Sequence, residues 1–435
     1  MKSSKIKIAI AGLGNVGSGV VEIIKKDIEK IKRATSIEIE IVAVSARSNK
    51  SFIENQNIKF FTDPLEMVEK SGADIIVELI GGIDIAKDII ELAIKKNIPV
   101  VTANKALLAI HGFEIAKLAQ SKNVLIGYEA SVGGSIPIIG AIKNGLVANN
   151  INSCYAIING TCNFILSKMQ NENLDFADAL KQAQELGYAE SDPTFDIKGI
   201  DSAHKIAVLA IIAFGIKQNF GNINIEGIDK ITIDDIKIAQ EFGFRIKLIA
   251  HASYENNILW QSVHPALISG KEKIANIDGS LNAVLISASN AKWQMMIGAG
   301  AGGLPTASAV IADIIEISKQ INCNNYIPTF GYQIDDLQDI VNRDINQKPY
   351  KFLVRVNFNK ENFSQLLQNS DGVNKIFGSE LKIAKSYFLD KENEIVVGII
   401  TEEYLKLELE SIISKLNSNL ITNYSLIRIE EINAI

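Results

Sequence analysis

The segment from Tyr188 to Lys205, YAESDPTFDIKGIDSAHK, combines many acidic and basic side chains within a short stretch. Glu190, Asp196 and Asp201 supply carboxylates, and an apolar helical pattern follows. Asp201 and Lys205 are four residues apart at its start, so they share one face of a helix. Carboxylates of this kind can hold a substrate ammonium group while a lysine gives or takes a proton at a carbonyl oxygen. The alternative is an exposed ion pair on a solvated first turn, which contributes little.

Lys105 ends the sequence VTANK, which follows a short apolar strand pattern. Open α/β sheets bind their ligands at the carboxyl ends of the strands. A lysine at this edge could bridge a cofactor and a substrate, although by itself it is equally consistent with a surface residue. His204 points away from the face shared by Asp201 and Lys205, so we expect it to be a packing or surface residue.

A glycine-rich turn follows the first apolar segment and consists of Gly12, Leu13, Gly14, Asn15, Val16 and Gly17. It has the pattern G-x-G-x-x-G, placed after a strand and before a helix. The first glycine allows the turn, the second lets the backbone approach a pyrophosphate, and the third lets helix and strand pack closely. The pattern predicts a dinucleotide site; the alternative is a glycine turn that binds no nucleotide.

The end of the second expected strand bears on which dinucleotide binds. Its sequence is AVSARSNK, from Ala43 to Lys50, and it lacks the carboxylate that would bond the ribose hydroxyls of NAD. Arg47 and Lys50 favour the 2′-phosphate of NADP instead. A solvated basic loop is the alternative.

These residues need a scaffold, and the first part of the chain alternates strand and helix patterns. We expect strands at Ile8–Ala11, Ile37–Ser45, Asp74–Ile80, Pro99–Thr102 and Asn123–Tyr128, with helices at Val16–Lys25, Ile85–Lys96 and Ile110–Ser121. Such alternation predicts an α/β fold with a Rossmann-type, doubly wound parallel sheet. The predicted dinucleotide-binding domain spans residues 1–135.

After residue 135 the pattern changes to an α+β mixture. We expect helices at Ile136–Leu146, Cys162–Asn171, Phe176–Leu186 and Ile200–Phe214, and strands at Ser153–Ile158 and Ile246–Ser253. Residues 136–297 are predicted to form a substrate-binding and dimerisation domain. The glycine-rich passage from Gly298 to Pro305 opens a helix at Ala307–Ile321, and residues 298–325 are predicted to return to the first domain.

The last part of the chain, residues 348–435, predicts an ACT-like βαββαβ unit that forms a separate module. The expected elements are a strand at Phe352–Phe358, a helix at Phe363–Ser370, strands at Ile383–Asp390 and Glu394–Thr401, a helix at Tyr404–Asn417 and a strand at Leu426–Glu430.

Length and charge exclude several classes of protein. With 435 residues the chain has room for about three domains. A net charge of −6 argues against a nucleic-acid partner. No apolar run approaches the roughly 20 residues of a membrane span, and the early glycine motif does not fit a signal peptide. Cys154, Cys162 and Cys323 are too scattered for a zinc site or a disulfide framework, so we expect a cytoplasmic protein without a membrane partner.

Taken together, the motifs resemble those of homoserine dehydrogenase, in its single-activity form with a C-terminal ACT domain. The resemblance extends over essentially the whole chain through AGLGNVGSGV (11–20), VELIGG (77–82), VVTANKALLA (100–109), YEASVGGSIPII (128–139), INGTCNFIL (158–166), AESDPTFDIKGIDSAHK (189–205), VHPALI (263–268), LNAVLI (281–286) and GAGAGGLPTASAVIADI (298–314). It implies the NAD(P)-dependent, reversible reduction of L-aspartate 4-semialdehyde to L-homoserine, a step toward threonine, isoleucine and methionine.

The resemblance also implies roles for individual residues. Lys205 matches the proton donor, Lys105 the lysine that touches cofactor and substrate, and Asp201 a supporting acid of the catalytic set. Glu190 matches the carboxylate that binds the substrate amino group, and Asp196 matches a supporting acid. Tyr188 and Thr161 also match positions at the substrate. Thr102, Ala103 and Arg47 join the glycine turn at the cofactor.

A structural monovalent cation, Na⁺, is also implied by the resemblance. Its ligands would be the main-chain carbonyls of Glu129, Val132, Gly134 and Ile136. Oxygen ligands from a tight turn suit a hard cation, and the alternative is a plain strand-to-helix turn. A homodimer or higher homo-oligomer and a small-molecule substrate are further expectations.

One departure from the family pattern lies in the ACT-like unit. Amino-acid-binding ACT domains usually carry an Asp-x-x-Gly-like turn after their first strand, whereas this chain has Phe358-Asn-Lys-Glu-Asn-Phe363. Feedback by threonine or another amino acid therefore stays open. Two other functions also stay open: a regulatory pseudoenzyme that has lost catalysis, and a dehydrogenase for a different amino alcohol. Retention of Lys105, Glu190, Asp201 and Lys205 argues against the first.

Overall fold

The computed structural model describes residues 4–48, 57–217, 220–321, 326–361, 381–415 and 421–432, with the single residues 363, 377 and 434. Lys50 and Cys323 lie outside the described residues. No helix within these ranges is long and apolar enough to cross a membrane.

The first part of the chain forms a six-stranded sheet in the order β3-β2-β1-β4-β5-β6. Its strands are β1 (Ser4–Ala11), β2 (Ile37–Ser45), β3 (Lys59–Phe61), β4 (Ile75–Glu78), β5 (Val100–Thr102) and β6 (Ile126–Gly127). All neighbouring strands are parallel. This is the strand order of dinucleotide-binding sheets, so the predicted fold class is confirmed.

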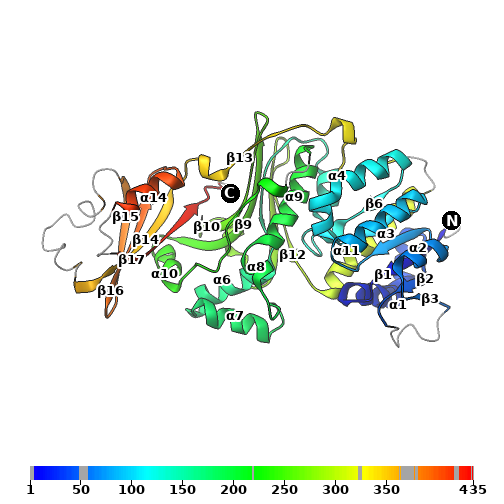
Figure 1. Cartoon of the computed structure of the whole chain (residues 1–435), viewed down its shortest axis with the longest axis horizontal. Helices are drawn as coiled ribbons and strands as arrows, with labels where there is room; N and C mark the ends of the chain where they lie inside the picture. Colours follow the sequence, from blue (N-terminus) through cyan, green and yellow to red (C-terminus); the bar gives the residue numbers. More distant parts are fainter. Residues whose placement is uncertain are drawn as a thin grey trace.

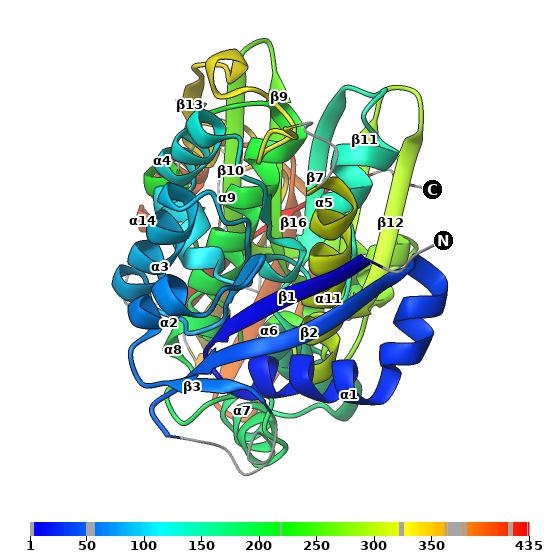
Figure 2. The same ribbon diagram turned by 90° about the vertical axis from the view of Figure 1, so that its right-hand side faces the viewer.

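Helices cover both faces of the first sheet (Figure 2). On one face lie α2 (Pro64–Lys70), α3 (Asp84–Lys95) and α4 (Lys105–Lys122); on the other lie α1 (Asn15–Thr35) and α11 (Gly303–Gln320). Alternate residues of β1 serve the two faces, since Ala9 packs with the first set and Ile8 and Ile10 with the second.

Helix α11 follows the second region in sequence but packs against α1. A Cβ atom on Gly19 would lie 2.9 Å from the carbonyl oxygen of Gly303, so only a glycine allows the two helices to approach so closely.

The middle and C-terminal parts form one mixed sheet of eleven strands, whose main path is β12-β11-β7-β9-β10-β17-β14-β16-β15. The strands of the middle part are β7 (Ile151–Ile157), β8 (Asn224–Ile225), β9 (Phe244–Glu255), β10 (Ile258–Ser269), β11 (Leu281–Ala288), β12 (Lys292–Ala299) and β13 (Val341–Arg343). Those of the C-terminal part are β14 (Phe352–Asn359), β15 (Ile383–Asp390), β16 (Glu394–Thr401) and β17 (Ile421–Ile429).

The helices of these parts lie along the sheet (Figure 1). They are α5 (Ile138–Gly140), α6 (Gly160–Glu172), α7 (Phe176–Glu185), α8 (Thr194–Ile197), α9 (Ile200–Phe214), α10 (Ile233–Glu241) and α14 (Lys406–Ser414). Short 3₁₀ turns lie at Glu129–Ser131, Phe220–Asn222, Lys273–Asn276, Ile334–Asp336 and Ile345–Gln347. Helix α9 also packs against α4, which joins the middle part to the first sheet.

The C-terminal unit is less separate than we expected. Strand β17 pairs in parallel with β10 at Ala266–Arg428 and Leu267–Ile429, so the unit continues the middle sheet. The pairing gives partners to main-chain groups that would otherwise form an exposed strand edge. The unit still has a core of its own, which includes Phe352, Val354 and Leu409. The expected helix at Phe363–Ser370 lies outside the described residues, apart from Phe363 itself.

Several other boundaries differ from those predicted. Helix α4 begins at Lys105 rather than Ile110, because the Asn104 side chain accepts a hydrogen bond from the Leu107 amide at 3.1 Å and caps the helix. The expected helix at 136–146 is broken: after α5 the backbone forms a π turn at Ala141–Gly145. Strand β6 is shorter than predicted.

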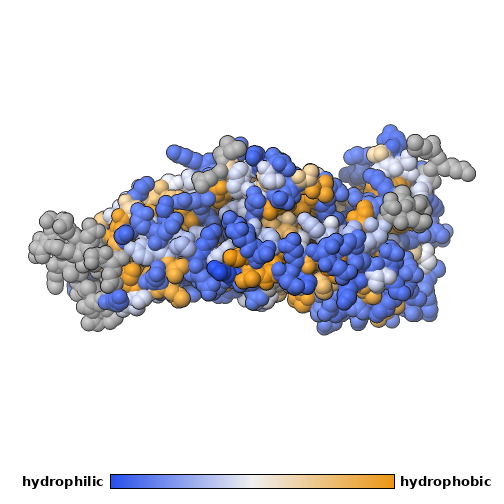
Figure 3. Space-filling view, turned by 90° about the horizontal axis from the view of Figure 1, so that it is seen from above, coloured by the Kyte–Doolittle hydropathy of each residue, from blue (hydrophilic) through white to orange (hydrophobic). Residues whose placement is uncertain are grey.

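The molecule is elongated when seen from above (Figure 3). Hydrophilic side chains dominate the surface over the first sheet, and apolar patches interrupt them over the middle part.

Candidate active site

The carboxylate of Asp201 lies between two lysines from different helices. Its Oδ2 accepts a hydrogen bond from Lys205 Nζ at 2.7 Å, and its Oδ1 lies 2.8 Å from Lys105 Nζ. Asp201 and Lys205 stand on the first turns of α9, and Lys105 is the first residue of α4. Because α4 packs on α9, the start of one helix meets the start of the other.

Burial and neighbouring charges shift the pKa values of Asp201 and Lys205 in opposite directions. Burial alone would raise the pKa of Asp201, but the charges of Lys205 and Lys105 outweigh it and hold that pKa well below its usual range. Burial lowers the pKa of Lys205, although the charge of Asp201 partly offsets this. Asp201 therefore stays ionised, and Lys205 releases a proton more readily than an exposed lysine.

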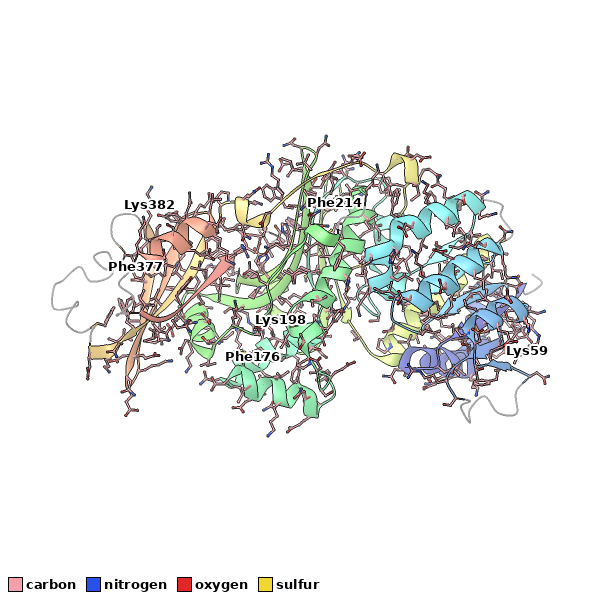
Figure 4. All side chains as sticks on the ribbon, in the orientation of Figure 1. Lys59, Phe176, Lys198, Phe214, Phe377 and Lys382 are labelled. Carbon is pink, nitrogen blue, oxygen red and sulfur yellow. The ribbon has the colours of Figure 1, made fainter. Side chains whose placement is uncertain are left out.

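Lys205 has a second fixed partner, the carbonyl of Ile158, at 2.6 Å. Ile158 follows β7, so the lysine is held between a strand end and its own helix. Its side chain is 10% exposed. The ammonium group thus has a set position from which it can donate to a bound oxygen. Figure 4 shows Lys198 on the turn before α9 and Phe214 at the far end of that helix.

Asn159 organises the carboxylates, a role that we did not expect from the sequence. Its Nδ2 donates to Asp196 Oδ1 at 2.8 Å and to Asp201 Oδ2 at 3.0 Å. Its Oδ1 accepts from the Cys162 amide at 2.8 Å and so caps α6. An asparagine between a strand and a helix is a recognisable capping signal, but nothing in its spacing indicates the carboxylates that it holds.

The substrate residues predicted near this group differ in their placement. Thr161 donates to the carbonyl of Tyr188 at 2.6 Å and lies 3.4 Å from Asp196 Oδ2. Burial raises the pKa of Asp196. The Tyr188 ring is exposed and packs on Phe164 with centroids 4.8 Å apart.

Glu190 is not drawn into the cluster. It is exposed, and the described part of the chain offers its carboxylate no ion pair. The group is therefore available to a ligand. His204 is a packing residue, as expected, with its ring stacked between Phe195 and Phe220.

Glu78 is a second residue whose role the sequence did not reveal. It is fully buried at the end of β4, where its carboxylate accepts from Thr102 Oγ1 at 2.6 Å and from the Ile80 amide at 2.8 Å. Burial raises the pKa of Glu78. Asn104 Nδ2 in turn bonds the Gly82 carbonyl at 2.6 Å. These bonds fix the turn through Ala103 that presents Lys105.

The glycine turn has the geometry that a dinucleotide requires. Gly12 has φ +100°, and a Cβ atom on Gly17 would lie 2.0 Å from the Gly12 carbonyl oxygen. At Gly14 an added Cβ would meet nothing within 4 Å, so the side facing the sheet edge is open. Leu13 is buried beside it, whereas Asn15 and Val16 begin α1. The first turn of α1 carries no acidic residue and no side-chain cap, so its amides remain available to an anion.

A hollow of about 570 Å³ borders this turn. Its lining includes Gly12, Gly14, Arg47, Ser48 and Ile80. The structure therefore places Arg47 beside the glycine turn, at the edge where β1, β2 and β4 end. These residues fit a dinucleotide, whose phosphates the main-chain amides of the turn would hold.

The loop predicted to hold a cation has the necessary tight turn. Gly133 and Gly134 have φ +74° and +58°, and Ser135 donates its amide to the Ala299 carbonyl at 3.0 Å. The carbonyl of Glu129 accepts only a long bond from the Val132 amide, 3.5 Å, and that of Ile136 accepts from Ile138 at 2.8 Å. A carbonyl oxygen has two lone pairs, so each of these two oxygens can accept a further contact.

Side-chain metal ligands are a separate matter. Within the ranges that the structure describes, no group of three or more His, Cys, Asp or Glu residues could hold a metal ion. Cys154 and Cys162 are buried free thiols.

Two family models match the chain. One, described as the homoserine dehydrogenase NAD-binding domain, matches residues 12–129, and the other, described as homoserine dehydrogenase, matches residues 137–315.

Curated relatives carry the same description. A homoserine dehydrogenase of Neisseria gonorrhoeae is 44% identical over 336 residues, which is 77% of each chain. One from Helicobacter pylori is 40% identical over 381 residues, covering 87% of this chain and 89% of the relative.

Solved structures agree with the fold. A homoserine dehydrogenase from Thiobacillus denitrificans superposes with a TM-score of 0.87 at 36% identity, covering 98% of both chains. A mutant of a hyperthermophilic archaeal homoserine dehydrogenase in complex with NADPH has a TM-score of 0.63 at 28% identity, covering 73% of this chain and 98% of the other.

Proposed function

This chain belongs to the homoserine dehydrogenase family and is an oxidoreductase with a nicotinamide-binding domain, and we propose how its own residues reduce L-aspartate 4-semialdehyde to L-homoserine. The observation that carries the proposal is the pair of ammonium groups on the two oxygens of Asp201. They lie where the carboxyl edge of the first sheet meets α9, which is the place for a substrate beside a dinucleotide.

Proton transfer is assigned to Lys205. A bound nicotinamide supplies the hydride. Lys205 protonates the oxygen of the aldehyde as it gains negative charge, and its lowered pKa makes that donation easier. Asp201 keeps the ammonium group oriented, and Lys105 contributes positive charge on the cofactor side of the site. In the direction of homoserine oxidation, Lys205 accepts the hydroxyl proton.

We assign binding of the substrate ammonium group to Glu190, because this carboxylate is exposed and has no ion pair within the described part of the chain. Asp196, Thr161 and Tyr188 shape the same side of the site. Asp196 is already bonded to Asn159, so it supports the arrangement rather than supplying the principal charge.

We assign NADP as the preferred cofactor, with NAD as the alternative. Arg47 borders the hollow beside the glycine turn, and Ser45 and Ala46 leave no carboxylate at the end of β2. An arginine there favours a 2′-phosphate, whereas a carboxylate would favour ribose hydroxyls.

Two structural features extend the proposal. We assign the loop carbonyls of Glu129, Val132, Gly134 and Ile136 to a sodium ion, which would stiffen the connection between the first sheet and α5. We also assign a homodimer, or a higher homo-oligomer, to the middle part. Supporting this, Leu281 and Ile297 on β11 and β12 are 43% and 49% exposed.

The C-terminal unit keeps the topology that led us to expect an ACT-like module, with β14 between β17 and β16. The turn from Phe358 to Phe363 lacks the acid and glycine of an amino-acid-binding ACT domain. We therefore assign no amino-acid effector to that turn. The proposed reaction is a step in the biosynthesis of threonine, isoleucine and methionine.

The test is to follow nicotinamide absorbance with purified protein, L-homoserine and either NADP⁺ or NAD⁺, beside a panel of related amino alcohols. The proposal expects L-homoserine with NADP⁺ to give the highest kcat/KM. A different amino alcohol as the best substrate would replace the assigned reaction, and no turnover of any substrate would support the regulatory alternative.

A further inference from the structure

Glu226 lies between the C-terminal unit and the turn that leads into α9. Its backbone belongs to the segment after β8, and its amide bonds the Val263 carbonyl at 2.7 Å. We infer that Glu226 is a positioning residue, through which the C-terminal unit holds the turn between Asp196 and Asp201. This inference rests on the proposed function, because it concerns those two carboxylates.

Two cationic side chains of the C-terminal unit bind the two oxygens of the Glu226 carboxylate. Arg428 on β17 donates from Nη1 to Oε1 at 2.9 Å, and Lys406 at the start of α14 lies 2.9 Å from Oε2. Burial alone would raise the pKa of Glu226, but the charges of Arg428 and Lys406 lower it to about 2. The group is thus ionised throughout the neutral range, and two separate elements of the unit hold it.

The backbone after Glu226 packs directly on the turn Ile197-Lys198-Gly199, which joins α8 to α9. The Ile228 amide donates to the Ile197 carbonyl at 2.8 Å. A Cβ atom on Gly227 would lie 2.3 Å from the Ile197 oxygen and 2.7 Å from Lys198 Cα, so the two backbones are in contact.

The turn itself has little freedom. Gly199 has φ +80°, and an added Cβ would lie 2.9 Å from Val263 Cγ1 and 3.3 Å from Ile225 Cγ2. Asp196 stands immediately before this turn, and Asp201 follows it after Ile200. A shift of the segment from Ile225 to Ile228 would therefore move both carboxylates.

The ion pairs of Glu226 are not backed by continuous packing between the C-terminal unit and the turn before α9. A cavity of about 1090 Å³ lies beside it, lined by residues of both parts that include Lys198, Gly227, Arg355, Lys406 and Tyr424. Glu226 and Lys406 line this cavity, so their ion pair between the two parts lies next to open space. Loss of the Glu226 charge would leave Arg428 buried without its carboxylate, at 2% exposure.

The experiment compares Glu226→Gln and Lys406→Gln with the unaltered chain in the homoserine assay. Glu226→Gln keeps the shape of the side chain, whereas Lys406→Gln also shortens it slightly; both variants weaken the ion-pair bridge. We expect kcat/KM for homoserine to fall about 10-fold in Glu226→Gln and less in Lys406→Gln. The KM for NADP⁺ should not change, because the glycine turn lies on the first sheet. The matched control is Glu431→Gln, which breaks an exposed ion pair to Lys351 in the same unit and should leave the kinetics unchanged.

Hydrogen exchange supplies a readout that does not depend on turnover. Amides of residues 194–201 should exchange faster in Glu226→Gln than in the unaltered chain or in Glu431→Gln. Unchanged exchange there, or equal rises in KM for both substrates with a lowered Tm, would overturn the positioning role. If the unaltered chain turns over no homoserine, the proposed function fails, whereas the exchange result still decides whether Glu226 positions the turn.

Discussion

Lys105 and Lys205 bind opposite oxygens of one carboxylate, that of Asp201, at 2.8 and 2.7 Å. Lys205 is nearly buried and Lys105 is 35% exposed, so the two ammonium groups differ in their surroundings while sharing a counter-ion. The buried lysine is suited to proton transfer. The more exposed one can meet ligands that enter at the edge of the first sheet.

Replacing Lys205 with methionine should abolish proton donation while filling the same space. Lys105 still neutralises Asp201, so we expect the chain to fold and kcat to fall about 100-fold or more. Steady-state kinetics and Tm together check this. Lys181→Met is a matched control, because it removes an exposed lysine paired with Glu185 on α7. A near-normal kcat in Lys205→Met would remove this residue from the mechanism.

Asn159→Asp tests the role of the asparagine at the carboxylates separately from its role as a helix cap. The new side chain can still accept from the Cys162 amide, but it cannot donate to Asp196 and Asp201 and brings a third negative charge. We expect kcat/KM to fall about 10- to 100-fold, since hydrogen bonds to charged groups are worth about 1.5–3 kcal/mol. Asn159→Ala removes the cap as well, so its Tm should also fall. A near-normal kcat/KM in Asn159→Asp would show that the positioning role is not needed.

Glu190→Gln should chiefly affect substrate binding. The side chain is exposed, so we expect stability to change by less than about 0.5 kcal/mol. The KM for homoserine should rise about 10-fold because a charge-assisted contact with the substrate ammonium group is lost. Glu185→Gln, on the exposed end of α7, serves as the control. An unchanged KM would show that another carboxylate holds the ammonium group.

Arg47→Ser should alter cofactor preference without altering the chemistry. We expect the KM for NADP⁺ to rise about 10-fold, since an arginine–phosphate contact is lost, while the KM for NAD⁺ stays the same. The ratio of the two kcat/KM values, measured on the same preparation, checks this. Equal changes with both cofactors would place Arg47 outside the 2′-phosphate site.

The stability contributed by Glu226 should depend on pH. Its pKa is lowered in the folded chain from the ordinary 4.5 to about 2, so the unfolded chain binds more protons between these values. The contribution is therefore complete above about pH 4.5 and is lost as the pH falls toward 2. The difference in free energy of unfolding between the chain and Glu226→Gln should be largest near neutrality and shrink on acidification. Denaturant unfolding at a series of pH values measures it, and a difference that does not change with pH would contradict the ion-pair origin.

Local pattern was sufficient for much of the fold. The strand patterns at Ile37–Ser45, Ile383–Asp390 and Glu394–Thr401 predict strands with the bounds that the structure has, and the apolar pattern at Ile200–Phe214 predicts α9. The start of α4 was misplaced because a single side-chain bond from Asn104 extends the helix, and the π turn after α5 depends on packing that periodicity does not express. The joining of β17 to β10 was missed because either strand could pair with another edge.

The sequence by itself determined the types of the elements, the glycine turn and the placing of Asp201 and Lys205 on one helical face, because these depend on residues a few positions apart. Only the tertiary structure decided that Lys105 completes the pair on Asp201, that Asn159 ties Asp201 to Asp196, and that Glu226 connects the C-terminal unit to the same turn. Those contacts join residues far apart in the chain. They form only when α4 packs on α9 and β17 on β10. The spacing of residues along the sequence does not show how close such elements lie in the folded chain.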